Sequence, residues 1–284
     1  MQDIIKKADV LIEALPYIRA FRGKPVIVKY GGSMLGSEAI LKGILEDLVF
    51  MSYVGLRPVL VHGGGPEINQ RLKSLGKKSA FIDGMRVTDA ETIRVVDDSL
   101  SDLNKALAQK LKALGGAAVG LTPAADGVIK AKPHPKSPEL GFVGTVAEVD
   151  ADALHRWLER GALPVVSPVG LGPNKQRYNI NADDAASAVA AAIRAEKLVL
   201  LTDVQGILRT AGEAESLMTT LTVTEAKDLI ARGIIQSGMI PKVQACIQAL
   251  RSGVRKTHII DAKTPHALLL EIFTSQGIGT EIVK

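Results

Sequence analysis

The sequence predicts an α/β protein, a three-layer αβα sandwich in which helices cover both faces of a mostly parallel central sheet. Short runs rich in β-branched residues alternate with longer segments of helical periodicity along most of the chain. This alternation is typical of βαβ units and a parallel sheet. No linker separates the two halves, so the 284 residues are expected to form one bilobed unit.

The first 24 residues stand outside this alternation. Their apolar residues share one helical face: Ile4, Ala8, Leu11, Ile12, Leu15 and Ile18. Pro16 interrupts the pattern and predicts a kink near the middle of the helix. The helix is expected either to cover its own core or to pack on another subunit.

In the first half of the chain, buried strands are expected at residues 26–30 and 57–62, with a helix between them. A capping box, Thr88 to Glu91, predicts the start of a long helix that runs to about Ala113. A strand is expected at 117–121. The segment 128–146 is expected to form a hairpin with a long loop, and 163–168 another buried strand.

The second half repeats this order. A helix is expected at 182–195, a strand at 197–202, and a helix capped by Thr222 and Glu225. A helix after Gly238, a strand at 256–260 and a short helix at 265–273 follow. The segment around 280–282 is expected to be a final edge strand.

Composition argues against several classes of protein. The net charge of +5 reflects either ordinary surface lysine and arginine or a positive cleft for anions. Aromatic residues make up 4% of the chain and no basic run interleaves with them, so nucleic-acid binding is not expected. The sequence lacks an apolar run of about 18 residues and a signal peptide, so no membrane association is expected. Cys246 is the only cysteine, and the cytoplasm is the expected location.

Two glycine-rich segments each follow a predicted strand directly, Gly31-Gly32 after Lys29-Tyr30 and Gly63-Gly64-Gly65 after His62. Ligands of open α/β sheets bind at the carboxyl ends of strands, and glycines let backbone N–H groups approach an anion. Anion binding is therefore favoured over two simple tight turns. The sequence lacks the P-loop and dinucleotide-binding patterns, and Lys29 precedes its glycines.

Other polar residues cluster at predicted element ends. Arg86 stands just ahead of a helix N-terminus, where a guanidinium is a poor neighbour unless an anion lies between them; a surface salt bridge is the alternative. One helix cap requires a single polar side chain, but the segment holds four: Asn179, Asn181, Asp183 and Asp184. This number favours a polar wall of a binding site. A third polar turn, Thr202-Asp203 to Gly206, ends a strand, and Lys242 follows a proline early in a helix.

Together and in this order, six motifs resemble the amino-acid-kinase family, and within it the members that phosphorylate an N-acylated glutamate. The match runs from about residue 26 to 282, with motifs at 29–32, 62–66, 83–89, 178–183, 200–204 and 238–242. The resemblance implies ATP-dependent phosphorylation of the side-chain carboxylate of N-acetyl-L-glutamate to an acyl phosphate, in arginine biosynthesis. It also implies an acyl-amino-acid lobe at about 25–177 and an ATP lobe at about 178–284.

The resemblance assigns roles to the motif residues. Lys29 and Lys242 would neutralise the transferring phosphoryl group, and Asp183 would orient both. The acceptor would be held by Gly64, Gly65, Arg86, Asn179 and Asn181. ATP would be bound by Gly31, Gly32, Thr202, Asp203 and Gly206. Mg²⁺ would sit on the ATP phosphates, and no protein residue is assigned to it. A Glu-like acceptor is already ionised at pH 7, since it titrates near about 4.3. No general base is therefore needed.

The N-terminal segment resembles the kinked helix of hexameric family members that arginine inhibits. A homohexamer, a trimer of dimers joined by residues 1–24, is therefore expected. L-arginine would act as a feedback inhibitor bound by Tyr17, Lys197, His258, Glu271 and Gly277. The alternative is a helix folded on its own subunit.

Two stretches of the substrate lobe depart from the family pattern. Residues 95–105, with Asp97 and Asp102, are more acidic than the usual apolar helix. The stretch 120–127, which includes Thr122 to Ala125, lacks the usual Ser-Gly-Lys-Asp-Gly. The acyl group and the dimer contacts stay open for that reason.

Two further functions stay open. The first is a sister kinase that acts on another acidic substrate, aspartate or aminoadipate carried on a protein. The second is a regulatory binding module without turnover, although a module of this kind would need only the glycine turns and not both lysines.

Overall fold

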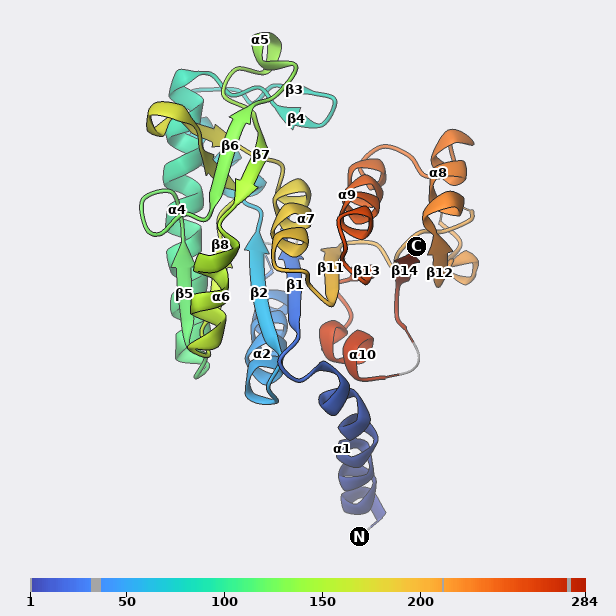
Figure 1. Ribbon diagram of the computed structural model, residues 1–284. Coiled ribbons are helices and arrows are strands. Elements are labelled where there is room, and N and C mark those ends of the chain that lie inside the picture. Colours follow the sequence, from blue (N-terminus) through green and yellow to red (C-terminus); the bar gives the residue numbers. More distant parts are fainter. Residues whose placement is uncertain (1, 32–36, 211, 275–276) are drawn as a thin grey trace.

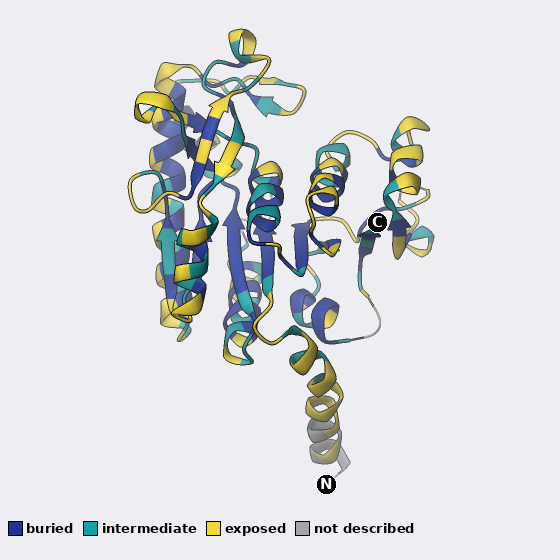
Figure 2. Cartoon of the chain, viewed as in Figure 1, coloured by how far each residue is buried: buried dark blue, intermediate teal, exposed yellow. Residues whose placement is uncertain are grey.

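The computed structural model describes residues 2–31, 37–210, 212–274 and 277–284 (Figure 1). A central sheet carries helices on both sides, and one helix projects away from this body. The strands of the sheet are buried along nearly their whole length, whereas exposed residues gather on the outer helix faces (Figure 2). The expected three-layer αβα sandwich is confirmed.

The central sheet has eight strands in the order β12-β14-β13-β11-β1-β2-β8-β5. In that order they span Thr220–Thr222, Thr280–Val283, Lys256–Asp261, Lys197–Thr202, Pro25–Tyr30, Arg57–His62, Leu163–Val166 and Ala118–Leu121. All neighbouring pairs are parallel except β13 and β14. The expectation that the last strand forms an edge is wrong, because β12, too short to read from the sequence, pairs with the outer side of β14.

Two groups of helices cover the two faces. Over one face lie α6 (Ala151–Glu159), α7 (Ala182–Ala192), α8 (Val223–Ala231) and α9 (Met239–Arg251). Over the other lie α2 (Glu38–Tyr53), α4 (Ala90–Ala113) and α10 (Ala267–Phe273). Each group buries its own apolar cluster against the sheet, so the protein has one core on each side of the strands.

Alternation along β1 and β2 sends two polar side chains to opposite faces. Ile27 packs in the core beneath α7 and α9, and Lys29 is two residues further along the same strand. Leu60 packs in the core beneath α2 and α4, and His62 is two residues beyond it. Because side chains alternate with a period of two, Lys29 faces α7 and α9, while His62 faces α4.

A smaller, four-stranded sheet stands beyond the carboxyl ends of β2 and β8 (Figure 1), in the order β10-β9-β6-β7. Its strands span Arg177–Asn179, Val169–Leu171, Ile129–Pro133 and Gly144–Val149. The expected hairpin at 128–146 is confirmed, since β6 and β7 pair antiparallel around a loop that holds α5 (Ser137–Leu140). The remaining elements are α3 (Gly65–Ser74), β3 (Phe81–Ile82), β4 (Met85–Arg86), η2 (Pro173–Lys175) and η3 (Ala214–Ser216).

The two predicted helix caps have different outcomes. The capping box of Thr222 and Glu225 at the start of α8 is confirmed in both of its hydrogen bonds. The expected box from Thr88 to Glu91 is wrong. Asp89 caps α4 instead, accepting hydrogen bonds from the backbone N–H groups of Glu91 and Thr92. The hydroxyl of Thr88 donates to the carbonyl of Arg86, while its backbone pairs with residues 140 and 142.

The N-terminal helix α1 (Gln2–Phe21) continues through Pro16 and projects from the body (Figure 1). Its final turns pack on the core, through Ala14, Tyr17, Ile18 and Phe21. Further out, Val10, Leu11 and Ile12 are each more than 60% exposed. In this structure α1 is an arm and not a cover over its own core.

Every helix in the described ranges is too short or too polar to cross a lipid bilayer.

Candidate functional site

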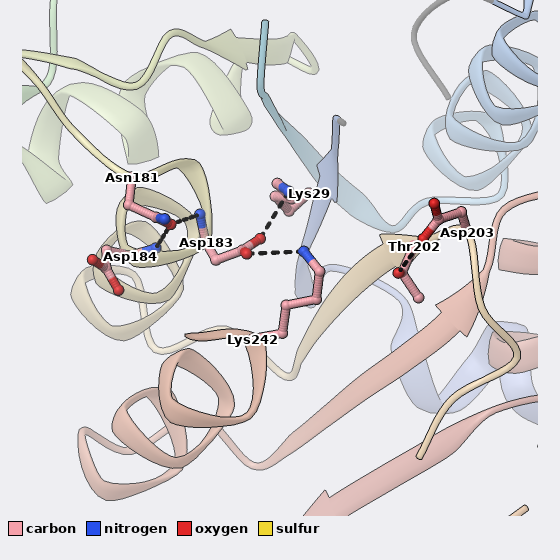
Figure 3. Close-up of polar contacts among 7 residues, drawn as sticks. All are labelled: Lys29, Asn181, Asp183, Asp184, Thr202, Asp203 and Lys242. Carbon is pink, nitrogen blue, oxygen red and sulfur yellow. Dashed lines mark hydrogen bonds and ion pairs between the residues drawn. The ribbon is translucent and has the colours of Figure 1, made fainter. Parts of the chain in front are cut away.

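Two lysines share one carboxylate at the centre of the molecule (Figure 3). The ammonium of Lys29, near the end of β1, lies 2.8 Å from Oδ1 of Asp183. The ammonium of Lys242, in the first turn of α9, donates to Oδ2 of the same residue at 3.0 Å. Exposed fractions of the three side chains are 7%, 8% and 19% for Lys29, Asp183 and Lys242. The structure therefore brings the three predicted catalytic residues together.

The buried cluster carries more positive than negative groups. Burial alone would raise the pKa of Asp183, but the ammonium groups of Lys29 and Lys242 hold that pKa below its usual value. Burial lowers the pKa of Lys29, and Asp183 offsets this effect only in part. A desolvated cluster with one ammonium in excess is costly unless an anion completes it.

The two glycine turns touch each other. A Cβ on Gly31 would lie 2.9 Å from the Cα and N atoms of Gly63, and one on Gly64 would lie 2.3 Å from Leu100 Cδ2. The backbone of Gly63 therefore excludes a side chain at position 31, whereas a side chain at position 64 would require Leu100 to shift. A Cβ on Gly65 would meet nothing within 4 Å, because Gly65 borders open space. The predicted residue Gly32 lies outside the described residues.

A cavity of about 320 Å³ opens between the glycine turn after β2 and the start of α7. It brings together all of the predicted acceptor residues and two of the predicted catalytic ones. Its walls include Lys29, Gly64, Gly65, Arg86, Asn179, Asn181 and Asp183. Lys242 is not in its wall and approaches Asp183 from α9 (Figure 3). The cavity therefore ends at the lysine cluster.

Arg86 is a buried cation of this cavity in addition to Lys29, with 7% of its surface exposed. Its guanidinium donates to the hydroxyl of Ser79 and, at 3.4 Å, to the carbonyl of Gly65. It also lies 4.9 Å from the ring centre of Phe81. Among the described residues no carboxylate lies within ion-pair distance of it, so the predicted alternative of a surface salt bridge is wrong. A buried guanidinium of this kind is suited to a ligand carboxylate.

The two asparagines ahead of α7 have different contacts. Asn179 ends β10 and donates from Nδ2 to the hydroxyl of Thr88 at 3.2 Å. Asn181 is the N-cap of α7, where its Oδ1 accepts from the backbone N–H groups of Asp183 at 2.8 Å and Asp184 at 3.3 Å. Asn181 therefore fixes the backbone of the carboxylate that holds both lysines. The same residue lines the cavity.

The third polar turn lies at the end of β11, the neighbour of β1 (Figure 3). Thr202 is buried, and its hydroxyl lies 3.4 Å from Asp203 Oδ1. Lys263, one strand further along, donates to the carbonyl of Asp203 at 2.8 Å. Gly206 packs against Thr280, since a Cβ there would lie 2.6 Å from that hydroxyl. Packing alone accounts for a glycine at that position.

A second, larger cavity of about 660 Å³ lies at the base of the arm α1, away from the lysine cluster. It brings together all five residues of the predicted arginine site: Tyr17, Lys197, His258, Glu271 and Gly277. His258 Nδ1 lies 2.7 Å from Glu271 Oε1, and Glu271 Oε2 accepts from the backbone N–H of Ile278. Lys197 lies 5.1 Å from the ring centre of Phe21 in α1.

The acidic departures in the long helix are paired locally. Asp97 lies 2.8 Å from Arg177 on β10, and Asp102 lies 2.9 Å from Arg71 on α3. Neither carboxylate is among the residues of the acceptor cavity. These acidic residues tie α4 to β10 and α3.

Sequence reasoning missed the residues that support the site from a distance. Ser79, just before β3, and Phe81, on β3, hold Arg86 on the paired strand β4, and Thr88 supports Asn179 from 91 residues away. Asn104 contacts His62 across 42 residues. Single serines, threonines and asparagines carry no motif, so only the resemblance of the segments around them could have indicated these roles.

Within the described ranges, no group of three or more His, Cys, Asp or Glu side chains is arranged to hold a metal ion. The donor set at the cluster consists of two ammonium groups and glycine backbone, which suits phosphate oxygens and not a bare cation. A Mg²⁺ ion accompanying ATP would therefore take its ligands mainly from phosphate and water.

Comparison with known proteins gives one consistent family. A sequence model of the amino acid kinase family matches residues 24–261. The acetylglutamate kinase of Syntrophomonas wolfei is 45% identical over 281 residues, covering 99% of this chain and 98% of the relative. The acetylglutamate kinase of Desulforamulus reducens is 47% identical over 282 residues, covering 99% and 98%.

Solved structures agree on the fold. N-acetylglutamate synthase from Neisseria gonorrhoeae, complexed with coenzyme A and N-acetyl-glutamate, matches with a TM-score of 0.84 at 26% identity. That match covers 98% of this chain and 63% of the synthase chain. The same synthase complexed with coenzyme A and L-arginine gives a TM-score of 0.82. Carbamate kinase from Giardia lamblia bound to AMP-PNP, at 17% identity and a TM-score of 0.69, shares the fold.

Proposed function

The chain belongs to the amino acid kinase family, and on that premise we propose that it transfers a phosphoryl group from ATP to the side-chain carboxylate of N-acetyl-L-glutamate. The product is an acyl phosphate of the arginine-biosynthesis pathway. The observation that carries the proposal is the buried pair of lysines on Asp183, placed at the end of a cavity lined by Arg86 and the glycine turn.

The chemical problem is electrostatic. The acceptor carboxylate and the phosphoryl group are both anionic, so the barrier comes from bringing two negative groups in line. Lys29 on β1 and Lys242 on α9 lie on the same face of the sheet and neutralise charge on the transferring group and the leaving oxygens. Asp183 holds both ammonium groups in place before the substrates bind.

The acceptor is held at its two ends. Arg86 and Asn179 take its α-carboxylate, and the backbone N–H groups of Gly64 and Gly65 point to the reacting carboxylate. ATP lies beyond the cluster, with Gly31, Thr202 and Asp203 around it. Residues of about 25–177 then form the acceptor lobe and those of about 178–284 the ATP lobe. Mg²⁺, carried on the phosphates, supplies further charge neutralisation.

The test is acyl-phosphate formation trapped as a hydroxamate by hydroxylamine. Purified protein is incubated with Mg²⁺-ATP and, in parallel, with N-acetyl-L-glutamate, aspartate or aminoadipate. We expect hydroxamate with N-acetyl-L-glutamate and at most a small fraction of it with the others. A preference for another acceptor would show that the protein is a sister kinase. If none of the three acceptors gives hydroxamate, the protein would be a binding module without turnover.

Feedback inhibition by arginine in a homohexamer is part of the same proposal. It is supported by the second cavity, where Glu271 and Glu281 offer carboxylates suited to a guanidinium and an ammonium group. It is also supported by the exposed apolar residues of α1, whose base forms part of that cavity through Tyr17 and Phe21. The cytoplasmic location expected from the sequence stays part of the proposal.

A further inference from the structure

His62 ends β2 and is completely buried on the face of the sheet that α4 covers, opposite to the face of the lysine cluster. Its Nδ1 lies 2.8 Å from the carbonyl oxygen of Gly63, the next residue. Its Nε2 lies 3.1 Å from Nδ2 of Asn104 on α4, and the same Nδ2 donates to the carbonyl of Val165 at 2.8 Å. Asn104 is itself only 1% exposed. The four groups form a buried chain from β8 through α4 to the glycine turn.

The direction of each hydrogen bond in this chain is determined by its ends. The carbonyl of Val165 can only accept, so the Asn104 atom beside it must be the amide nitrogen, which is a donor. Nε2 of His62 must therefore accept the second amide hydrogen, and the ring proton of a neutral imidazole must sit on Nδ1. That proton points to the carbonyl of Gly63, which also can only accept. Burial lowers the pKa of His62 to about 4, so the ring is neutral at physiological pH.

The orientation of the Gly63 carbonyl also fixes the orientation of the Gly64 N–H, which belongs to the same peptide group. The peptide between Gly63 and Gly64 is trans, and in a trans peptide the C=O and N–H bonds point in opposite directions. When the Gly63 carbonyl is held by the ring beneath α4, the Gly64 N–H is turned away from that ring. Gly64 lines the acceptor cavity.

We propose that His62 and Asn104 are positioning residues that aim the Gly64 N–H at the reacting carboxylate. The inference rests on the proposed function and adds to it the device that orients its backbone donor. α4 contributes a second contact, since a Cβ on Gly64 would lie 2.3 Å from Leu100 Cδ2 and would force that side chain to shift. One helix thus sets both the position and the direction of the donor, and it does so through a histidine that never titrates near neutral pH.

Two substitutions of His62 test the roles of the two ring nitrogens separately. His62→Asn places an amide near the position of Nδ1 and can still donate to Gly63. His62→Gln places an amide near Nε2 and can still pair with Asn104, but it leaves the Gly63 carbonyl without its donor. His62→Asn loses more side-chain volume than His62→Gln, because asparagine is one methylene shorter. A purely structural role at this buried position therefore predicts the larger loss of activity and thermal stability in His62→Asn, the opposite of the order expected from positioning.

The expected result is a difference in kcat. A donor misplaced by about 1 Å can cost about 10²-fold in rate. We therefore expect His62→Gln to lose on the order of 10²-fold in kcat, with the KM for ATP changed less than about threefold, while His62→Asn keeps kcat within about tenfold of the wild type. Equal kcat losses in the two variants, or a loss seen only as a raised KM for ATP, would overturn the inference.

The ring tautomer gives a readout that does not depend on activity or on the folding of a variant. In ¹⁵N-detected histidine spectra of the wild-type protein, His62 is expected to show a protonated Nδ1 and an unprotonated Nε2; its signals are assigned by their loss in His62→Asn or by selective labelling. A protonated Nε2, or an imidazolium at pH 7, would overturn the inference. Wild-type protein that forms no hydroxamate would overturn the proposed function, whereas an active wild type with the wrong tautomer would overturn only this inference.

Discussion

At the scale of single residues, the site depends on charge that is placed before any substrate arrives. Lys29 and Lys242 come from elements more than 200 residues apart and meet on the two oxygens of Asp183. Their ammonium groups are held in a region that excludes water, where fixed charge acts more strongly than in solution. Interactions of this kind contribute mainly to the transition state.

Lys29→Ala and Lys242→Ala are each expected to lower kcat by about 10²- to 10³-fold, with much smaller changes in KM, because each removes one preorganised donor. Steady-state kinetics with N-acetyl-L-glutamate and ATP measures both constants. Lys130→Ala, a change at a lysine whose side chain is 61% exposed, serves as the control. A variant with near-normal kcat and only a raised KM would show that its lysine is a binding residue.

Arg86→Lys is expected to weaken binding of the acceptor by about tenfold or more while leaving ATP binding unchanged. An ammonium cannot make the two parallel hydrogen bonds that a guanidinium offers to a carboxylate. Calorimetric titration with N-acetyl-L-glutamate and, separately, with an ATP analogue measures the two affinities. Arg71→Lys, at a partly exposed arginine paired with Asp102, is the matched control. Loss of ATP affinity instead would reverse the assignment of the two lobes.

Most residues of the site could be predicted because they stand in short, ordered motifs at the ends of predicted strands. Lys29, Arg86 and Asp183 are such residues. The contacts that hold them could not be predicted in the same way, because they join segments far apart in the chain. Ser79 supports Arg86, and Asn104 sets the tautomer of His62; neither belongs to a recognisable pattern.

At the scale of elements, the start of α7 determines the position of the shared carboxylate. Asn181 caps the helix through its side-chain oxygen, and the N–H group of Asp183 is one of its two donors. Long apolar runs made β1, β2 and β11 easy to predict. Strands of two or three residues, such as β4 and β12, are too short to show a period of two and were missed. The cap of α4 shifted by one residue because the backbone of Thr88 pairs with the loop after α5.

Asn181→Ala is expected to lower the free energy of unfolding by about 1 kcal/mol through loss of the cap, and to lower kcat because the backbone of Asp183 loosens. Asn181→Ser keeps a capping oxygen but has no amide group. Chemical denaturation and kinetics on both variants separate two roles. If the cap dominates, the serine variant behaves like the wild type; if the amide binds the acceptor, the serine variant shows a raised KM for N-acetyl-L-glutamate.

At the scale of the whole molecule, the arm α1 is the feature whose exposed apolar residues would need a second chain to cover them. It exposes the apolar side chains of Val10, Leu11 and Ile12, while its base lines the second cavity. A ligand in that cavity would contact the arm and the sheet together. Arginine can inhibit only if it binds a less active arrangement of subunits better than the active one, because binding alone shifts no equilibrium.

Deletion of residues 1–24 is expected to convert a hexamer to dimers and to abolish inhibition by arginine while leaving kinase activity. Light scattering and an activity titration with arginine measure the two effects. Leu11→Asp, at a residue 67% exposed, should reproduce the change in mass without removing any part of the cavity. A full-length protein that is already dimeric, or a truncated one that stays hexameric and inhibited, would contradict the expectation.

The burial of Lys29 implies that nucleotide binding is coupled to proton uptake. Its pKa is lowered in the free protein, chiefly by burial, and nearby phosphate charge must raise it again. At alkaline pH, where part of the Lys29 population is neutral and phosphate groups with a pKa of about 6 are fully ionised, each molecule of nucleotide that binds should therefore draw a fraction of a proton from the buffer. Calorimetric titration of AMP-PNP at high pH should give heats that differ between two buffers of different ionisation enthalpy, and Lys29→Met should remove most of that difference. Affinity for the nucleotide should fall as pH rises through the lowered pKa of Lys29. Identical heats of binding in the two buffers would contradict the expectation, because they would show that Lys29 is already fully charged in the free protein.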